Sequence, residues 1–216
     1  MSTVCKICIN SKEEDVSSMT LAHIDGIHDQ IVHEVSEWPL ATENENFKID
    51  ENSPTILSIK QVSEDTTEIY YNCFSKAKEL TSYLTKSLNT KAVVNMYQST
   101  SEAGYWAYFI NGELLREIDS GDGEILEDNG IKLEFEGDEL GHDIGEEDGQ
   151  LYVFDSDDMD EYNDLVGINV EVYQQYESNW QNYKINSNQN SSSNEKNNQT
   201  INLGGNLGKM SPNKTH

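Results

Sequence analysis

The sequence predicts an α+β protein with a mixed or mostly antiparallel sheet, two to three packed helices and a disordered C-terminal tail. β-prone segments follow one another with few helices between them, which argues against a doubly wound sheet. From residue 186 the chain is rich in Asn, Ser, Gln and Gly and has no aromatic residue. Such a composition cannot bury enough apolar surface to offset the entropy of ordering. We therefore expect one acidic domain, residues 1–185, and a disordered tail, residues 186–216.

The first third of the chain predicts a strand, a helix and a hairpin. Residues 4–9 alternate in polarity and are β-prone, as in a strand. Residues 19–37 have apolar side chains at spacings of three and four, which predicts an amphipathic helix that Pro39 ends. The segments 56–62 and 68–74 are β-prone and are joined by a short polar connection, so we expect a β-hairpin.

The middle of the chain predicts a helix and a second hairpin. Ser75 is a candidate N-cap for a helix with one apolar face. That face is formed by Ala77, Leu80, Leu84 and Leu88. The segment 92–97 is the next predicted strand. Asn111-Gly112 separates two β-prone segments, 105–110 and 113–118, and this dipeptide favours a two-residue turn with positive φ at both positions.

The last part of the predicted domain contains three short strands and a third helix. The strands are expected at residues 131–135, 151–154 and 168–173. Between the last two, Asp157 or Asp158 can cap a helix, and Asp158 and Glu161 have the spacing of a capping box. Gly167 supplies the C-terminal stop of this helix.

Charge is the strongest compositional feature. The chain has 40 Asp and Glu against 14 Lys and Arg, a formal net charge of −26. Nucleic-acid binding requires basic residues that displace counterions, and anionic lipid repels acidic surfaces, so we expect neither nucleic-acid nor membrane partners. The same surface attracts cations and basic proteins.

The compartment is predicted from the N-terminus, the hydropathy and the cysteines. Residues 1–10 lack the charged and apolar regions of a signal peptide, and the sequence contains no apolar stretch long enough to span a membrane. The three cysteines are an odd number in a chain without an export signal. These observations favour reduced thiols and a cytoplasmic location.

Metal and cofactor motifs are incomplete, so we predict neither a metal nor a cofactor. Cys5 and Cys8 have the spacing of half a zinc site, but they lie in a strand pattern where positions three apart face opposite sides. The histidines at 23, 28 and 33 do not share a helical face. The segments 119–130 and 155–164 both depart from the calcium loop of EF-hands, although a looser divalent-cation site stays open as an alternative.

The acidic residues are concentrated in one segment. Between Asp119 and Asp164 there are 19 acidic residues and one basic residue, Lys132, which leaves a net charge of −18. Apolar residues are interleaved with these acids, so a folded scaffold is expected to hold them. The candidate partner-binding residues in this segment are Asp138, Glu139, Asp143, Glu146, Glu147, Asp148, Asp155, Asp157 and Asp158.

No catalytic residues are predicted, because the known nucleophile and phosphate-binding motifs are absent and no carboxylate is distinguished from the others. In acidity and size the chain is similar to bacterial immunity proteins, and this resemblance implies neutralisation of a basic toxin. Our leading hypothesis is a non-enzymatic binding domain for a basic protein, with an immunity-type inhibitor as its concrete version. The alternatives are a metal-dependent or carboxylate-based enzyme and an accessory domain tethered by its tail.

Overall fold

The computed structural model describes residues 3–25, 30–41, 56–98, 103–121, 124–138, 140, 142–143, 152–168 and 178–186. Within these ranges the chain forms three helices and an antiparallel sheet of nine strands. The α+β class with a mostly antiparallel sheet is therefore confirmed. Most of the predicted tail, residues 187–216, lies outside the described residues.

The nine strands of the main sheet are arranged in the order β2-β11-β3-β4-β1-β5-β6-β7-β8. Every neighbouring pair is antiparallel. A separate two-stranded ribbon pairs β9 with β10. The strands are β1 (Thr3–Ile9), β2 (Gln30–Ser36), β3 (Ile56–Gln61), β4 (Thr67–Tyr71), β5 (Lys91–Gln98), β6 (Ala103–Ile110), β7 (Glu113–Gly121), β8 (Glu124–Gly130), β9 (His142–Asp143), β10 (Tyr152–Val153) and β11 (Trp180–Asn186).

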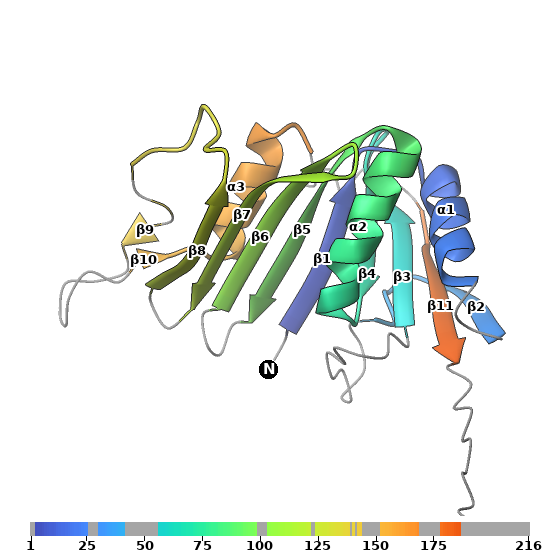
Figure 1. Cartoon of the computed structure of the whole chain (residues 1–216). Coiled ribbons are helices and arrows are strands. Elements are labelled where there is room, and N and C mark those ends of the chain that lie inside the picture. The colour runs from blue at the N-terminus through green and yellow to red at the C-terminus, as the bar shows by residue number, and fades with distance from the viewer. Residues whose placement is uncertain are drawn as a thin grey trace, which may run out of the picture.

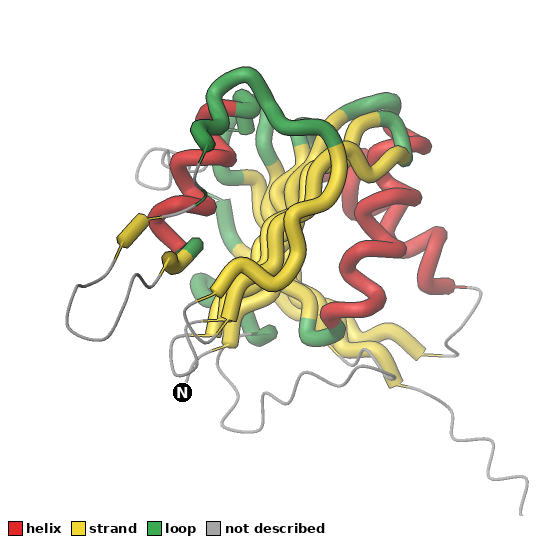
Figure 2. The backbone as a smooth tube through the Cα atoms, turned by 60° about the vertical axis from the view of Figure 1, so that its left-hand side comes forward, coloured by secondary structure: helices red, strands yellow, loops and turns green. Residues whose placement is uncertain are grey.

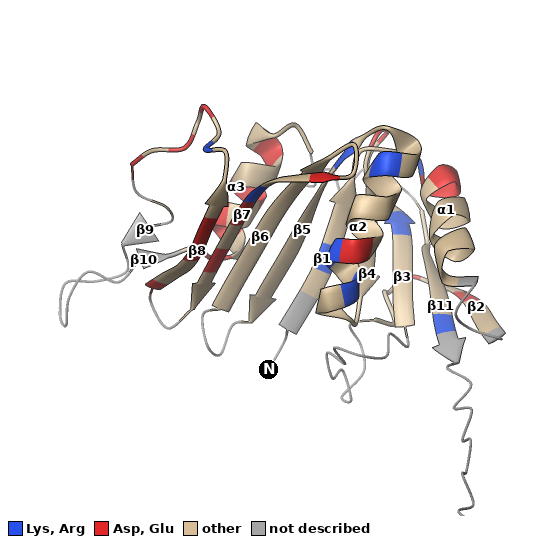
Figure 3. Ribbon diagram, viewed as in Figure 1, with Lys and Arg blue, Asp and Glu red and all other residues tan. Residues whose placement is uncertain are grey.

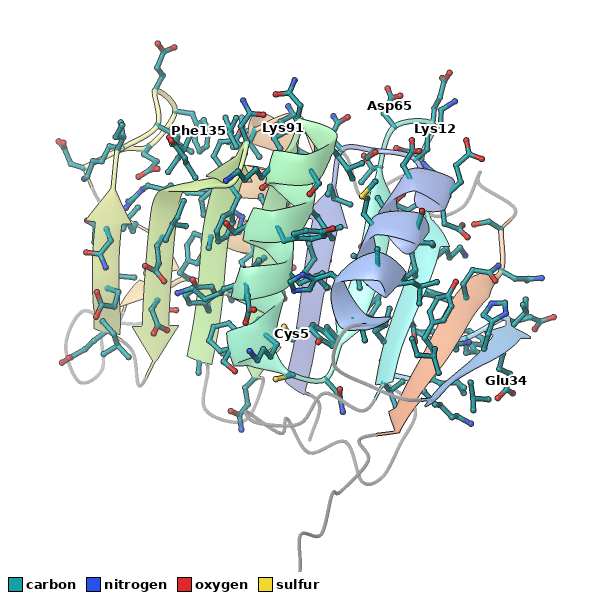
Figure 4. The ribbon with its side chains drawn as sticks, turned by 45° about the vertical axis from the view of Figure 1, so that its right-hand side comes forward. Cys5, Lys12, Glu34, Asp65, Lys91 and Phe135 are labelled. Carbon is teal, nitrogen blue, oxygen red and sulfur yellow. The ribbon has the colours of Figure 1, made fainter. Side chains whose placement is uncertain are left out.

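The helices divide the sheet into two faces, each with its own apolar core. Helices α1 (Glu13–Asp25) and α2 (Phe74–Leu88) cover one face, and α3 (Ser156–Leu165) lies on the other (Figures 1 and 2). Because strand side chains alternate, Cys5 and Ile7 of β1 point to opposite sides from Lys6 and Cys8. Cys5 faces α1 and α2 (Figure 4), whereas Cys8 packs with Trp106 in the core beneath α3. The two cysteines therefore do face opposite sides of the sheet.

The helix predicted over residues 19–37 is wrong in its second half. Helix α1 begins earlier, at Glu13, with three acidic residues in its first turn, where the helix dipole favours them. It ends at Asp25, and residues 30–36 form strand β2, which pairs with β11. Ile31, Val32 and Val35 are β-branched and favour a strand once a partner strand is available.

Both predicted hairpins are confirmed. β3 pairs with β4, and β6 pairs with β7 through Asn111-Gly112. Asn111 has φ of 53° and Gly112 has φ of 91°, as a turn with positive φ at both positions requires. Helix α2, which follows β4, begins at Phe74 rather than after Ser75. Its N-cap, Cys73, makes no side-chain cap hydrogen bond.

Two further expectations are corrected near the acidic segment. The strand expected at residues 131–135 is instead β8, Glu124–Gly130, and it ends at Gly130, where φ is +94°. The cap of α3 is Asp155, and its capping-box partner is Asp158. Strand β11 was not predicted, and the strand expected at 168–173 lies, apart from Ile168, outside the described residues.

We predict that Gly112→Val destabilises the protein by about 1–3 kcal/mol, because it places a β-branched residue at positive φ. Its Cβ would also lie 2.8 Å from Cβ of Lys86 on α2. Urea unfolding measures the change. Gly121→Ala is the control, because its Cβ would meet no atom closer than 3.4 Å. Equal stability of Gly112→Val and the parent protein would contradict the turn assignment.

Candidate functional site

Helix α3 is capped at its N-terminus and is held to the sheet near its C-terminus. The Asp155 carboxylate accepts hydrogen bonds from the backbone N–H groups of Asp157 and Asp158 at 2.8 and 3.2 Å. At the other end, Nζ of Lys91 on β5 donates to the carbonyl of Val166 at 2.6 Å. This lysine satisfies a carbonyl that the helix itself leaves open. These contacts fix which face of α3 is exposed.

The exposed face of α3 is a stripe of four carboxylates. Asp157, Asp160, Glu161 and Asp164 are spaced three and four residues apart, so they lie on one side of the helix. Together with Leu165 they line a shallow hollow of about 400 Å³. The Leu165 side chain is half exposed. The hollow is therefore an acidic surface with an apolar residue at its end.

The acidic stripe extends the charge of the neighbouring strands. Acidic residues gather on β8, on the loop after it and on α3, whereas several basic residues lie on α2 (Figure 3). β8 is the end strand of the sheet order and pairs with β7 alone among the described strands. Its residues Glu124, Glu127 and Asp128 are exposed. The whole β8–α3 end of the molecule is thus acidic.

The nine predicted binding residues have four different outcomes. Asp138 and Asp157 are exposed, and Asp157 belongs to the stripe. Asp155 and Asp158 are half-buried and form the capping box, so their first role is structural. Asp143 lies in β9, and the structure does not describe its side chain. Four predicted residues lie outside the described ranges: Glu139, Glu146, Glu147 and Asp148.

A second candidate site is a pocket between the sheet and the first turn of α3. Its volume is about 250 Å³. Side chains from β4, β1 and β5 form its floor, and three of them lie directly opposite one another across the strands: Tyr70 opposite Lys6, and Lys6 opposite Asn95. The lining residues are Lys6, Tyr70, Asn95, Tyr97, Ser156, Met159 and Asp160.

Charged groups are clustered beside this pocket. The ammonium of Lys6 lies 3.3 Å from Oδ1 of Asp160 and 3.8 Å from Oε1 of Glu68. The Glu68 side chain is fully buried, and the Cys8 thiol lies 3.7 Å from its carboxylate. Lys6 is therefore held between two carboxylates, one buried and one half exposed.

The protonation states follow from this arrangement. Burial, followed by the charge of Glu68, raises the pKa of the Cys8 thiol well above its ordinary value and also raises the pKa of Tyr70. Burial alone would lower the pKa of Lys6, but the acidic groups around it outweigh this effect, so the pKa is raised. At neutral pH the site holds a protonated amine, a neutral thiol and a neutral phenol. None of these three is an active nucleophile or base.

Asn95 is the unusual residue of the pocket. Its side chain is 4% exposed, and neither Oδ1 nor Nδ2 has a hydrogen-bond partner in the described structure. Buried polar groups are almost always paired, because leaving one unpaired costs free energy. By contrast Asn163, also buried on this face, accepts a hydrogen bond from Nε1 of Trp106 at 2.9 Å. Asn95 is thus an exception that needs an explanation.

Both sites are only partly predictable from the sequence. Of the four acids in the stripe, the sequence predicted only Asp157 as a binding residue. Asp160, Glu161 and Asp164 follow it at helical spacing, so they can be recognised once the helix is assigned. The pocket residues are single polar residues inside β-prone segments, such as Lys6 between Cys5 and Ile7. A polar residue on a covered face of a strand is the signal, but finding it requires knowing that α3 covers that face.

No protein-family model matches the chain, and neither a curated protein nor a solved structure matches it. In the described residues, no three His, Cys, Asp or Glu side chains are grouped as metal ligands. No helix among them is long and apolar enough to cross a membrane. The function therefore has to be inferred from the two sites themselves.

We predict that Asn95→Leu stabilises the protein by about 1–2 kcal/mol, because it removes an unpaired buried amide and adds apolar burial. The matched substitution Asn163→Leu should destabilise it by about 1–3 kcal/mol, because it leaves the Trp106 N–H without its acceptor. Urea unfolding of both variants measures the two changes. Destabilisation of the same size in both would show that the Asn95 amide is paired in solution.

Proposed function

We propose that this chain is a non-enzymatic binding protein whose acidic α3 surface docks on a basic protein. The observation that carries the proposal is the stripe of four acids on α3 next to the half-exposed Leu165. Protein interfaces have an apolar centre within a polar, solvent-accessible rim, and on α3 Leu165 and the acids beside it supply these two parts. A lysine- or arginine-rich partner is the complement of this surface.

The energetics of α3 support a functional reason for the stripe. Like charges three or four residues apart destabilise a helix by about 0.2–0.5 kcal/mol per pair. Asp164 also lies near the C-terminus, where the helix dipole disfavours an acid, and the last turn has no basic residue. Asp157 lies in the favourable first turn and Asp160 pairs with Lys6. The helix keeps Glu161 and Asp164 at a cost to its own stability, which a role in binding explains.

The enzymatic alternative has less support. The pocket contains a phenol and an amine, and the Cys8 thiol is buried beside it, but the raised pKa values leave all three groups protonated at neutral pH. The three cysteines are free and buried, which supports the cytoplasmic location proposed from the sequence. An inhibitor of a basic toxin, as in immunity proteins, remains the concrete version of the proposal.

The test is the association kinetics of the triple variant Asp157→Asn, Glu161→Gln, Asp164→Asn with a basic protein captured by pulldown at low salt. Exposed interface charges act mainly on association. We expect the association rate at low salt to fall about tenfold, with a smaller change in dissociation and a flatter dependence on salt.

The control is a variant with the same change in net charge on other surfaces, Glu14→Gln, Asp15→Asn, Asp65→Asn. These three side chains are exposed and lie outside the β8–α3 end. The control should associate at nearly the parent rate. If both variants slow equally, only net charge matters, and the proposed surface is wrong. Calorimetry with Ca²⁺, Mg²⁺ and Mn²⁺ tests the metal-dependent alternative separately.

A further inference from the structure

The pocket of about 250 Å³ beneath the first turn of α3 lies between the helix and the sheet and shares only Asp160 with the acidic stripe, and its size is that of a small-molecule site. A cavity of about 150 Å³ is enough to hold one benzene ring. Tyr70, Tyr97 and Met159 supply apolar surface to its lining. Such a mixture of aromatic walls and a few polar groups is typical of ligand pockets.

The polar groups of the pocket have unused hydrogen-bonding capacity. The Asn95 amide offers one acceptor and two donors, and none of them is used within the described structure. Lys6 has three donors, and its one hydrogen bond among the described residues is the 3.3 Å contact to Asp160. The unused groups therefore include an adjacent donor and acceptor on Asn95 and further donors on Lys6.

The charges around the pocket select against simple ions. Lys6 lies between Glu68 and Asp160, so an ammonium and two carboxyl groups are grouped beside the pocket. An added anion would meet the two carboxylates, and an added cation would meet the Lys6 ammonium. The backbone N–H groups at the start of α3 are already occupied by the Asp155 carboxylate, so the helix does not offer them to an anion. A neutral ligand meets none of these repulsions.

We propose that the pocket binds a small planar ligand with a neutral amide group. The ligand N–H donates to Oδ1 of Asn95, and its carbonyl accepts from Nδ2 of Asn95 and from Lys6. An amide pairs with another amide through two such hydrogen bonds because each carries a donor beside an acceptor. The aromatic side chains Tyr70 and Tyr97 contact the planar part. Both amide atoms of Asn95 are covered in this structure, so Met159, whose unbranched side chain adapts at low cost, moves to admit the ligand.

The experiment is an NMR titration of the ¹⁵N-labelled full chain with benzamide, nicotinamide and uracil as neutral amides. Benzoate and benzylamine are the controls, because each keeps the ring but replaces the amide with an anion or a cation. We expect saturable shifts at Lys6, Tyr70, Asn95 and Ser156 with at least one neutral amide. That compound should bind at least about tenfold more tightly than either charged control, as the loss of paired hydrogen bonds implies.

Variants separate binding from folding. Asn95→Leu should weaken binding of the amide at least about tenfold while the chain stays folded in urea unfolding. Asn129→Leu is the control, because Asn129 is an exposed residue of β8 and does not line the pocket. It should bind as the parent does. The proposal is overturned if no neutral amide binds at the pocket, if benzoate or benzylamine binds as tightly, or if Asn95→Leu binds as the parent does.

Discussion

The acidic end of this protein depends on one buried arginine. Arg116 is the only arginine of the chain, and its side chain is fully buried on β7. Its Nη2 lies 2.7 Å from Oε2 of Glu136 and 2.6 Å from Oδ1 of Asp128, and its Nη1 donates to the carbonyl of Asn129 at 2.8 Å. Since the Glu136 side chain is also fully buried, each partner requires the other. This network fixes the loop after β8 against the sheet.

The Arg116 network also supports helix α3. The loop that Glu136 fixes also carries Phe135, whose ring packs edge-on against Tyr162 of α3 at 5.1 Å between centroids. Tyr162 in turn contacts the rings of Trp106 and Phe154. A single positive charge therefore holds a strongly acidic strand and loop in place and, through Phe135, adds to the contacts that Lys6 and Lys91 make with α3. Without it, the carboxylates of this strand and loop would lose the buried cation that offsets their repulsion.

The two faces of the sheet have different chemistry. The face under α1 and α2 is a continuous apolar core with all its large side chains packed together. The face under α3 combines apolar residues with Lys6, Glu68, Asn95 and Arg116. Polar groups on a covered face cost stability unless they are paired. Lys6, Glu68 and Arg116 have charged partners here, so the unpaired Asn95 is the group that is better explained by binding than by folding. Both proposed sites lie on this face.

The sequence predicted elements whose local chemistry decides their structure. Asn111-Gly112 defines its hairpin without help from the rest of the chain, and the apolar face of α2 is periodic enough to be read directly. Residues 30–36 were misassigned because their helical spacing is overridden by pairing with β11, which is about 150 residues away and was itself not predicted. The cap of α3 was predicted two or three residues late, because the six residues 155–160 contain four acids that were equivalent candidates.

The candidate sites were less predictable for the same reason. Acid density located the α3 surface, but only the folded helix separates Asp157 on the stripe from Asp155 and Asp158 in the cap. The pocket was invisible to sequence because Lys6, Tyr70 and Asn95 meet through cross-strand register between β4, β1 and β5. Register is set by the whole sheet, and no local pattern encodes it.

The exposed face of α3 is the proposed docking surface for a basic protein. The most direct test is an NMR titration of the ¹⁵N-labelled chain with decalysine at low salt, because this probe has positive charge and no other recognition feature. We expect the backbone amide shifts caused by decalysine to concentrate on residues 157–165 and on β8. Shifts spread equally over the exposed acids of α1 and of the loop between β3 and β4 would contradict it, since they would reflect net charge alone.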